Sequence, residues 1–147
     1  MTAIETVKAL QGAIQSGNFE RARTFLSDDF EFSGPVPEPL SAEQWMGLSA
    51  ILKTAFPNLD YHFRIESAEG NVVHMSAQLS GTHRGNLDLT AMGMGMIPST
   101  GRSFSATREQ SRVTLRGDKI VSCVGQPTEG AGLLAVLSQL GVKVPSR

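Results

Sequence analysis

The hydrophobic pattern changes its period at Pro57, and this change restricts the fold more than any other feature of the chain. Before Pro57, apolar residues recur every three to four positions, which places them on one face of an α-helix. After Pro57, apolar and polar residues alternate, as they do in half-buried β-strands. Proline does not continue a helix comfortably, so Pro57 marks the boundary. The pattern predicts a helical N-terminal part followed by a sheet.

Three helices are expected before Pro57, with a short strand and a proline-rich loop between the second and the third. Apolar residues at helical spacing define the first helix at residues 4–14, and Asn18 caps a short second helix. Ser41 and Gln44 have the S-x-x-Q spacing of a capping box, in which each side chain bonds to the backbone of the other. This box opens the third helix.

Four long strands and one helix are expected after Pro57. Alternation predicts strands at residues 59–65, 73–79, 103–115 and 119–124, and a short apolar helix follows at residues 130–140. Strands joined by short turns pair antiparallel, so the expected fold class is α+β, with a curved antiparallel sheet and the helices packed against it. A chain of 147 residues is long enough for one core, and residues 1–147 are expected to form a single domain.

The composition excludes several classes of partner. A net charge of −1 argues against nucleic-acid binding, which needs clustered Lys and Arg. No apolar run is long enough to span a bilayer, and the N-terminus lacks the pattern of a signal peptide. Cys123 is the only cysteine, which excludes an intrachain disulfide. We expect a soluble cytoplasmic protein that binds neither nucleic acid nor membranes.

The stretch "GTHRGNLDLTAMGMGMIPSTGR", residues 81–102, is rich in glycine and methionine. It does not fit a phosphate-binding loop, because it lacks the G-K-[ST] ending and the strand and helix that flank such a loop. Its glycines suit tight turns. Met92, Met94 and Met96 alternate, and methionine fills irregular apolar surfaces. The stretch is interpreted as a lid over a pocket mouth or a contact between subunits; plain packing of a loop on the core is an equal alternative.

The histidines do not form a metal site. A metal ion needs three or four ligands at workable spacing, and His62, His74 and His83 are separated along the chain. No cofactor is expected. His83 stands at a predicted strand end. It is a candidate catalytic residue at the pocket mouth, and the alternative is a structural histidine held by hydrogen bonds.

Several short motifs together resemble one family. "FPNLDYHF", "LSGTHRG", "IPSTGR", "GDKIV" and "LLAVLSQLGV" occur in this order. They resemble the SnoaL-like branch of the nuclear transport factor 2-like superfamily, over about residues 56–142. The resemblance implies a cone-shaped, cystatin-like α+β barrel, a deep pocket between helices and sheet, and dimers formed through the sheet. The SnoaL-like branch includes cyclases that close polyketide rings by aldol chemistry.

The sequence departs from those cyclases at the positions that carry their chemistry. They have an acid/base Asp within an E-H-W-D pattern just after K-I-V, where this chain has "SCVG" at residues 122–125. The partner position of that Asp falls near Ser111. Neither position holds a carboxylate or imidazole that shuttles protons near neutral pH. The cyclase mechanism is therefore not transferred to this protein. Ala77 also stands where a Trp is common in relatives, which leaves more room in the pocket.

Strand alternation and the third helix predict which side chains face the pocket. The apolar lining is expected to contain Trp45, Tyr61, Phe63, Met75 and Leu79, with Glu109 and Ser111 as its polar floor. A carboxyl buried there would have a raised pKa, so Glu109 is the second catalytic candidate, as a general base. For Glu109 the alternatives are a salt bridge or a position at the rim of the pocket. For Trp45 and Tyr61 the alternative is packing in the core.

Two functions remain open from the sequence. The first is a homodimeric binding module whose cone holds a small apolar molecule. The second is a cofactor-free enzyme that performs acid/base chemistry on a small apolar metabolite. The dimer is expected to bury one face of the sheet, where Gln78, Gln110, Arg112 and Thr114 would suit a mixed interface better than a core.

Overall fold

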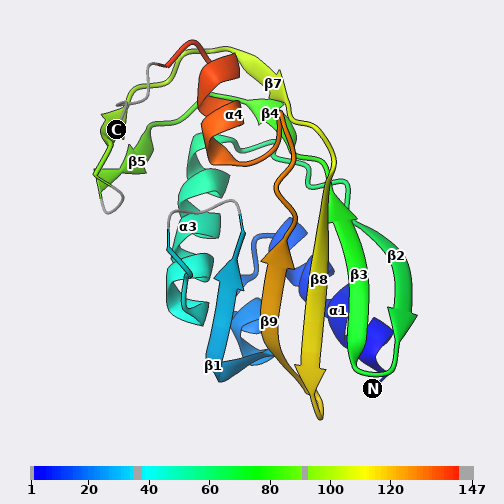
Figure 1. Ribbon diagram of the computed structural model, residues 1–147. Coiled ribbons are helices and arrows are strands. Elements are labelled where there is room, and N and C mark those ends of the chain that lie inside the picture. Colours follow the sequence, from blue (N-terminus) through cyan, green and yellow to red (C-terminus); the bar gives the residue numbers. More distant parts are fainter. Residues whose placement is uncertain (1, 35–37, 91–92, 143–147) are drawn as a thin grey trace.

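The computed structural model describes residues 2–34, 38–90 and 93–142 (Figure 1). Its first half is mostly helical, with one strand between the second and the third helix. These elements are α1 (Ala3–Gln15), α2 (Phe19–Thr24), β1 (Leu26–Ser33) and α3 (Ala42–Ala55). The side chain of Asn18 caps α2, and Ser41 and Gln44 form the capping box of α3. The helix starts predicted at these two places are confirmed.

The main sheet has five strands in the order β1-β9-β8-β3-β2. The four strands of this sheet that follow Pro57 in the chain are β2 (Arg64–Glu69), β3 (Val72–Ala77), β8 (Glu109–Arg116) and β9 (Lys119–Gly125). These four pair antiparallel as predicted, but β1 pairs with β9 in parallel. The predicted curved antiparallel sheet is therefore confirmed for these four strands, and the parallel pairing of β1 at its edge was not predicted. The prediction rested on strands joined by short turns, and β1 and β9 are far apart in the chain.

Two of the predicted strands are interrupted. The strand predicted at residues 59–65 begins only at Arg64, because His62 has φ 46, which extended strands do not adopt. The strand predicted at residues 103–115 is divided into β7 (Ser103–Ser105) and β8. β7 leaves the main sheet and pairs antiparallel with β4 (Ser80–Thr82). The neighbouring strands β3 and β8 are thus both interrupted at the same end of the sheet, and the chain continues into β4 and β7 there. These two interruptions bend the sheet.

The glycine- and methionine-rich stretch contains a small hairpin that the sequence did not reveal. β5 (Leu87–Leu89) and β6 (Gly95–Ile97) pair antiparallel beside α3. Met92 lies outside the described residues. The last helix, α4 (Leu133–Gln139), packs against β7 at the same end of the molecule (Figure 1).

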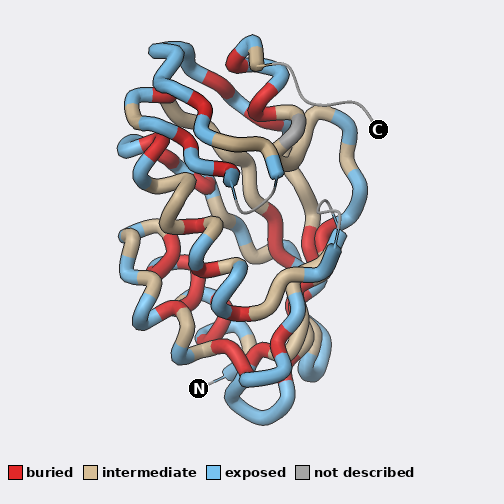
Figure 2. Tube along the Cα trace, turned by 90° about the vertical axis from the view of Figure 1, so that its left-hand side faces the viewer, coloured by how far each residue is buried: buried red, intermediate tan, exposed pale blue. Residues whose placement is uncertain are grey.

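The hydrophobic core fills the space between the helices and the inner face of the sheet. In Figure 2 the buried residues recur along this interior, and exposed residues mark the turns. Val7 of α1 and Val73 and Val113 of the sheet are fully buried. The α1 residues and the alternating strand residues predicted to face inward meet here, and the helices cover only one face of the sheet. None of the described helices is long and apolar enough to cross a membrane.

Candidate ligand-binding cavity

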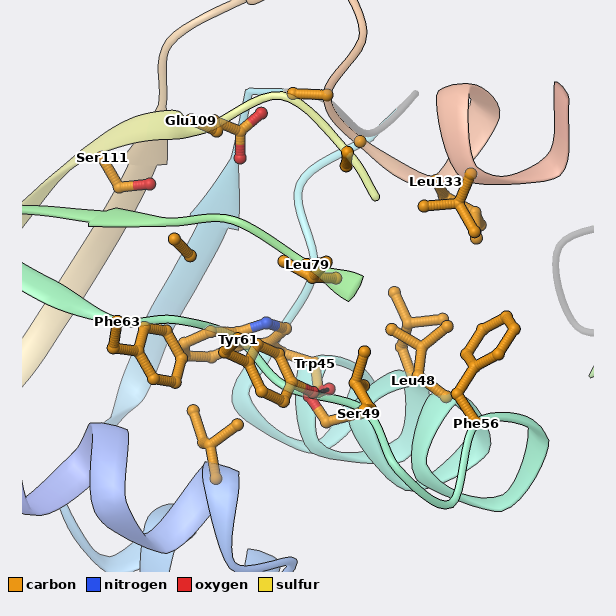
Figure 3. Close-up of a pocket in the computed structure, with 18 of the residues that line it drawn as sticks. Trp45, Leu48, Ser49, Phe56, Tyr61, Phe63, Leu79, Glu109, Ser111 and Leu133 are labelled. Carbon is orange, nitrogen blue, oxygen red and sulfur yellow. Dashed lines mark hydrogen bonds between the residues drawn. The ribbon is translucent and has the colours of Figure 1, made fainter. Parts of the chain in front are cut away.

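A cavity of about 400 Å³ lies where the sheet bends away from α3 and the start of α4 (Figure 3). Its wall is formed by α3, the inner faces of β3 and β8, the segment before β2, and residues 131–136. Most lining side chains are apolar, among them Ile14, Leu48, Leu52, Phe56, Leu59, Ala77, Phe104 and Val136. A cavity of this size and polarity suits a small apolar molecule.

The structure places all the predicted ligand-binding residues in this lining. They are Trp45, Tyr61, Phe63, Met75, Leu79 and Ser111. Trp45 comes from the face of α3 that points at the sheet. Tyr61 and Phe63 lie on one side of the segment before β2, where their rings stack, although His62 between them is not extended. Their orientation agrees with the sequence pattern; their role in binding stays a prediction.

Aromatic rings form two stacked walls of the cavity. The rings of Tyr61 and Phe63 are 4.9 Å apart and nearly parallel, at 5°. Trp45 stacks on Phe32 of β1 with centroids 5.0 Å apart, and on Phe30 at 5.3 Å. Stacking holds these rings in place, so the walls are formed in advance of any ligand. The contribution of Phe32 was not predicted, because nothing in the sequence shows that β1 lies beside α3.

Tyr61 places a polar atom in this apolar wall. Its hydroxyl is buried and has no hydrogen-bond partner among the described residues. The Ser49 hydroxyl lies beside it in Figure 3 and donates to the Trp45 carbonyl oxygen at 2.9 Å. Burial raises the pKa of Tyr61 to about 12, although Ser49 partly opposes this. The phenol therefore stays protonated at physiological pH.

A row of polar side chains, on β8 and on the segment just before it, runs from the surface into the cavity. Thr107, Glu109 and Ser111 are two residues apart and all line the cavity. Thr107 is exposed, Glu109 is half-buried and Ser111 is buried. The row thus leads from the mouth to the floor, with the carboxyl of Glu109 between the two hydroxyls.

Glu109 is the one carboxyl among the described residues that line the cavity. Its Oε2 atom is buried without a hydrogen-bond partner, and no salt bridge to it occurs within the described part of the chain. Burial raises the pKa of Glu109 above its ordinary value, because a low-dielectric site disfavours the charged form. The salt bridge weighed as an alternative for this residue is absent from these described residues.

Cys123 on β9 lies behind the polar floor and does not line the cavity. Burial raises the pKa of its thiol to about 12, Ser111 partly lowers it, and the charge of Glu109 raises it further. A thiol with such a pKa is neutral and a poor nucleophile. Cys123 is 1% exposed and packs as a small buried hydrophobic residue.

His83 lies outside the lining of the cavity. Its ring packs behind Phe56, with ring centroids 5.4 Å apart, and is fully buried. The Nδ1 atom accepts a hydrogen bond from the Thr100 backbone N–H at 3.2 Å, and burial lowers the pKa of the imidazole. The position at the pocket mouth expected for a catalytic His83 is therefore wrong, and its contacts are those of the structural alternative.

The cavity lining includes residues that the sequence did not assign to it. Ala131, Gly132 and Leu133 at the start of α4 line the cavity, as does Met94. Met94 agrees with the interpretation of the methionine stretch as a lid, whereas Met96 is 54% exposed. The short α4 has no pattern that relates it to a pocket. Among the described residues no group of three or more His, Cys, Asp or Glu side chains is arranged to hold a metal ion.

The family model described as "SnoaL-like polyketide cyclase" matches residues 4–131, most of the chain. The chain belongs to the SnoaL-like family. No curated protein matches its sequence. The resemblance seen in the short motifs is thereby confirmed, and it extends over the N-terminal helices.

Solved structures share the SnoaL-like fold over nearly the whole chain. One is described as a candidate SnoaL-like polyketide cyclase from Jannaschia sp. CCS1, at 22% identity and a TM-score of 0.70, covering 97% of this chain and 93% of that one. IdmH from Streptomyces antibioticus, described as a candidate polyketide cyclase, has the same identity and TM-score and covers 97% and 100%. A protein from Catenulispora acidiphila DSM 44928 with a ketosteroid isomerase-like fold, crystallised with trimethylamine, shows 20% identity, a TM-score of 0.65, and coverage of 95% and 94%. At these identities the likeness concerns the fold, which is the predicted α+β class.

Proposed function

We propose that this SnoaL-like protein binds a small, largely apolar molecule in the cavity between α3, α4 and the bent sheet. The observation that carries the proposal is the cavity itself, about 400 Å³ in volume and lined mainly by apolar and aromatic side chains. Burying apolar surface of a ligand there is favourable by about 25 cal/mol per Å². The few polar groups, on β8 and at Tyr61, would orient the molecule.

We further propose that the protein does not catalyse polyketide cyclisation, although two of its structural neighbours are described as candidate cyclases. By the resemblance described above, the acid/base pair of such cyclases corresponds to residues 122–125 and to a position near Ser111 here. Ser111 lines the cavity, but a hydroxyl without a neighbouring base does not exchange protons near neutral pH. The nearest candidate carboxyl, Glu109, enters from a different position on β8.

Native mass spectrometry of the purified protein tests the binding proposal. We expect a species that carries an apolar small molecule, or one that takes up an apolar compound of fitting size with one-to-one stoichiometry per chain. An Ala77→Trp variant, which fills part of the cavity, provides the control and should lose the adduct. Adducts of equal occupancy in both proteins would show that the molecule binds elsewhere.

A second candidate function is a cofactor-free enzyme that uses Glu109 as general acid/base. It is favoured by one observation: Glu109 has a buried carboxyl oxygen with no partner in the described residues, inside a cavity lined mainly by apolar side chains. Such a carboxyl, with a pKa moved toward neutrality, exchanges protons with a bound substrate more readily than an exposed one. The neutral phenol of Tyr61 would orient the substrate from the opposite wall.

Carboxylate titration by NMR tests this second function. We expect the pKa of Glu109 to lie above the free-peptide value of about 4.3 and to change when an apolar ligand fills the cavity. Spectra of a Glu109→Gln variant assign the resonance. A Glu109 pKa at the free-peptide value, insensitive to apolar ligands, would remove the catalytic candidate while leaving binding possible.

We also propose that two chains associate through the outer face of the sheet. Arg112 and Thr114 of β8 point away from the buried core, and the helices leave this face uncovered (Figure 1). Mixed polar and apolar faces of this kind suit isologous dimers. No nucleic acid or membrane is proposed as a partner.

A further inference from the structure

The cavity combines aromatic walls with a single carboxyl, and this combination restricts the chemistry of its ligand. Trp45 and Phe32 form one stacked pair, and Tyr61 and Phe63 form another. Figure 3 shows Glu109 on the side of the cavity opposite Trp45, Tyr61 and Phe63. The faces of aromatic rings carry negative potential and attract cations, most strongly when the site excludes water.

Within the described part of the chain, no cationic side chain neutralises Glu109 from inside the cavity. Among the described residues, no Lys, Arg or His side chain lines it. The adjacent Arg108 is engaged elsewhere: its guanidinium donates to the His62 carbonyl and to the Ser76 hydroxyl, both at 2.9 Å. A carboxyl in such a place is neutral, or else it receives its positive partner from outside.

We propose that the physiological ligand is an apolar amine: a hydrophobic body that stacks on the aromatic walls and bears one protonated nitrogen that donates to the Glu109 carboxylate. This inference rests on the proposal that the cavity binds an apolar molecule. The cation supplies the missing partner of Glu109, and the aromatic walls on the opposite side of the cavity hold the hydrophobic body of the ligand. An anionic ligand would be repelled by the Glu109 carboxylate, and none of the described lining residues is a basic side chain that could donate to it.

Among the described residues that line the cavity, Glu109 is the one carboxyl whose charge changes with pH. The other titratable groups that face Glu109 are Tyr61 across the cavity and Cys123 on β9, and burial raises the pKa of each to about 12. The lining residues from α3 and α4 include no charged side chain. The complex holds one proton between carboxylate and amine, so affinity is greatest between the pKa of Glu109 and the pKa of the amine, and falls on both sides.

Three naphthalene compounds that differ in one group test the inference: naphthylmethylamine, naphthylmethanol and naphthoate. Binding is measured by calorimetry from pH 5 to pH 10 with the full chain, with Glu109→Gln, and with Glu69→Gln as a matched control at an exposed glutamate on β2. At pH 8 we expect the amine to bind about tenfold more tightly than the alcohol, because charge-assisted hydrogen bonds are the stronger ones. Naphthoate should bind most weakly.

The variants separate charge from shape. In Glu109→Gln we expect amine and alcohol to bind with equal affinity, and in Glu69→Gln the preference for the amine should persist. Equal binding of amine and alcohol by the unaltered protein, or a preference that survives Glu109→Gln, would overturn the amine proposal while leaving the apolar cavity as a binding site. If none of the three compounds bound, the cavity itself would fail as a binding site, and both proposals with it.

Discussion

Replacing Glu109 by Gln should stabilise the protein, and the gain should depend on pH. Gln keeps the shape of the side chain and removes a charge that has no partner among the described residues. In the unfolded chain the carboxyl ionises near pH 4.3, whereas burial raises its pKa in the folded protein. The folded state therefore holds the proton more tightly, and the free energy of unfolding falls as pH rises from the unfolded to the folded pKa of Glu109.

The size of this effect follows from how far Glu109 is buried. An unpartnered buried charged group costs several kcal/mol, but Glu109 is only half-buried, and solvent screens part of its charge. We expect Glu109→Gln to raise the free energy of unfolding by about 1 kcal/mol at pH 8. For a chain of this length that is an increase in Tm of about 2–4 °C. Below about pH 4 both side chains are neutral, and the difference should vanish.

Urea denaturation at pH 8 and pH 4 measures both values directly. Glu69→Gln is the control, because this side chain is exposed on β2, and the substitution should leave stability within about 0.5 kcal/mol at either pH. A Glu109→Gln protein that is less stable at pH 8, or that gains equally at both pH values, would refute the reasoning. The first result would mean that Glu109 is ionised and paired with a cation, and the second would mean that its carboxyl is solvated.

Further predictions concern the backbone and the assembly. Gly85→Ala should destabilise the fold by more than about 1 kcal/mol in denaturant titration, because a Cβ at this position would meet the Thr54 carbonyl oxygen. Gly47→Ala, in open space within α3, should stabilise by about 0.5–1 kcal/mol in the same assay, and the opposite order would contradict the helix geometry. Equilibrium sedimentation at micromolar concentration should show a dimer, and Arg112→Glu on the outer face should shift it toward monomer; a monomeric unaltered protein would exclude the sheet interface.

Local signals predicted most of the fold, and long-range pairing decided the rest. The capping box at Ser41 and Gln44 and the turn at residues 116–118 are local, and the helix and the hairpin that they predict are present. The parallel pairing of β1 with β9 joins residues about 90 positions apart, and no local pattern reports it. The positive φ of His62 is equally invisible, because histidine gives no signal for it as glycine does.

The candidate site shows the same division. Alternation with period two predicted that Tyr61, Phe63 and Glu109 face inward, since neighbouring side chains on an extended chain point to opposite sides. The direction of the His83 side chain is not set by strand alternation. This residue stands at a turn between β4 and β5, where backbone contacts with Thr100 decide its direction, and period alone cannot predict on which side of Phe56 it lies.

The last prediction tests whether the ligand occupies the cavity at all. Ala77 on β3 lines the cavity and pairs with Glu109 in the β3–β8 register, so an indole at this position would fill space beside the carboxyl. Extra volume in a packed core costs about 1–3 kcal/mol, but here the cavity of about 400 Å³ accepts it, and Ala77→Trp should keep the fold. We expect its affinity for naphthylmethanol to fall more than about tenfold, because the stacked walls are then covered. Ser67→Trp, at an exposed position on β2, adds the same side chain outside the cavity and should bind as the unaltered protein does. A folded Ala77→Trp protein with unchanged affinity would place the ligand away from the part of the cavity beside Ala77 and Glu109, which the indole fills.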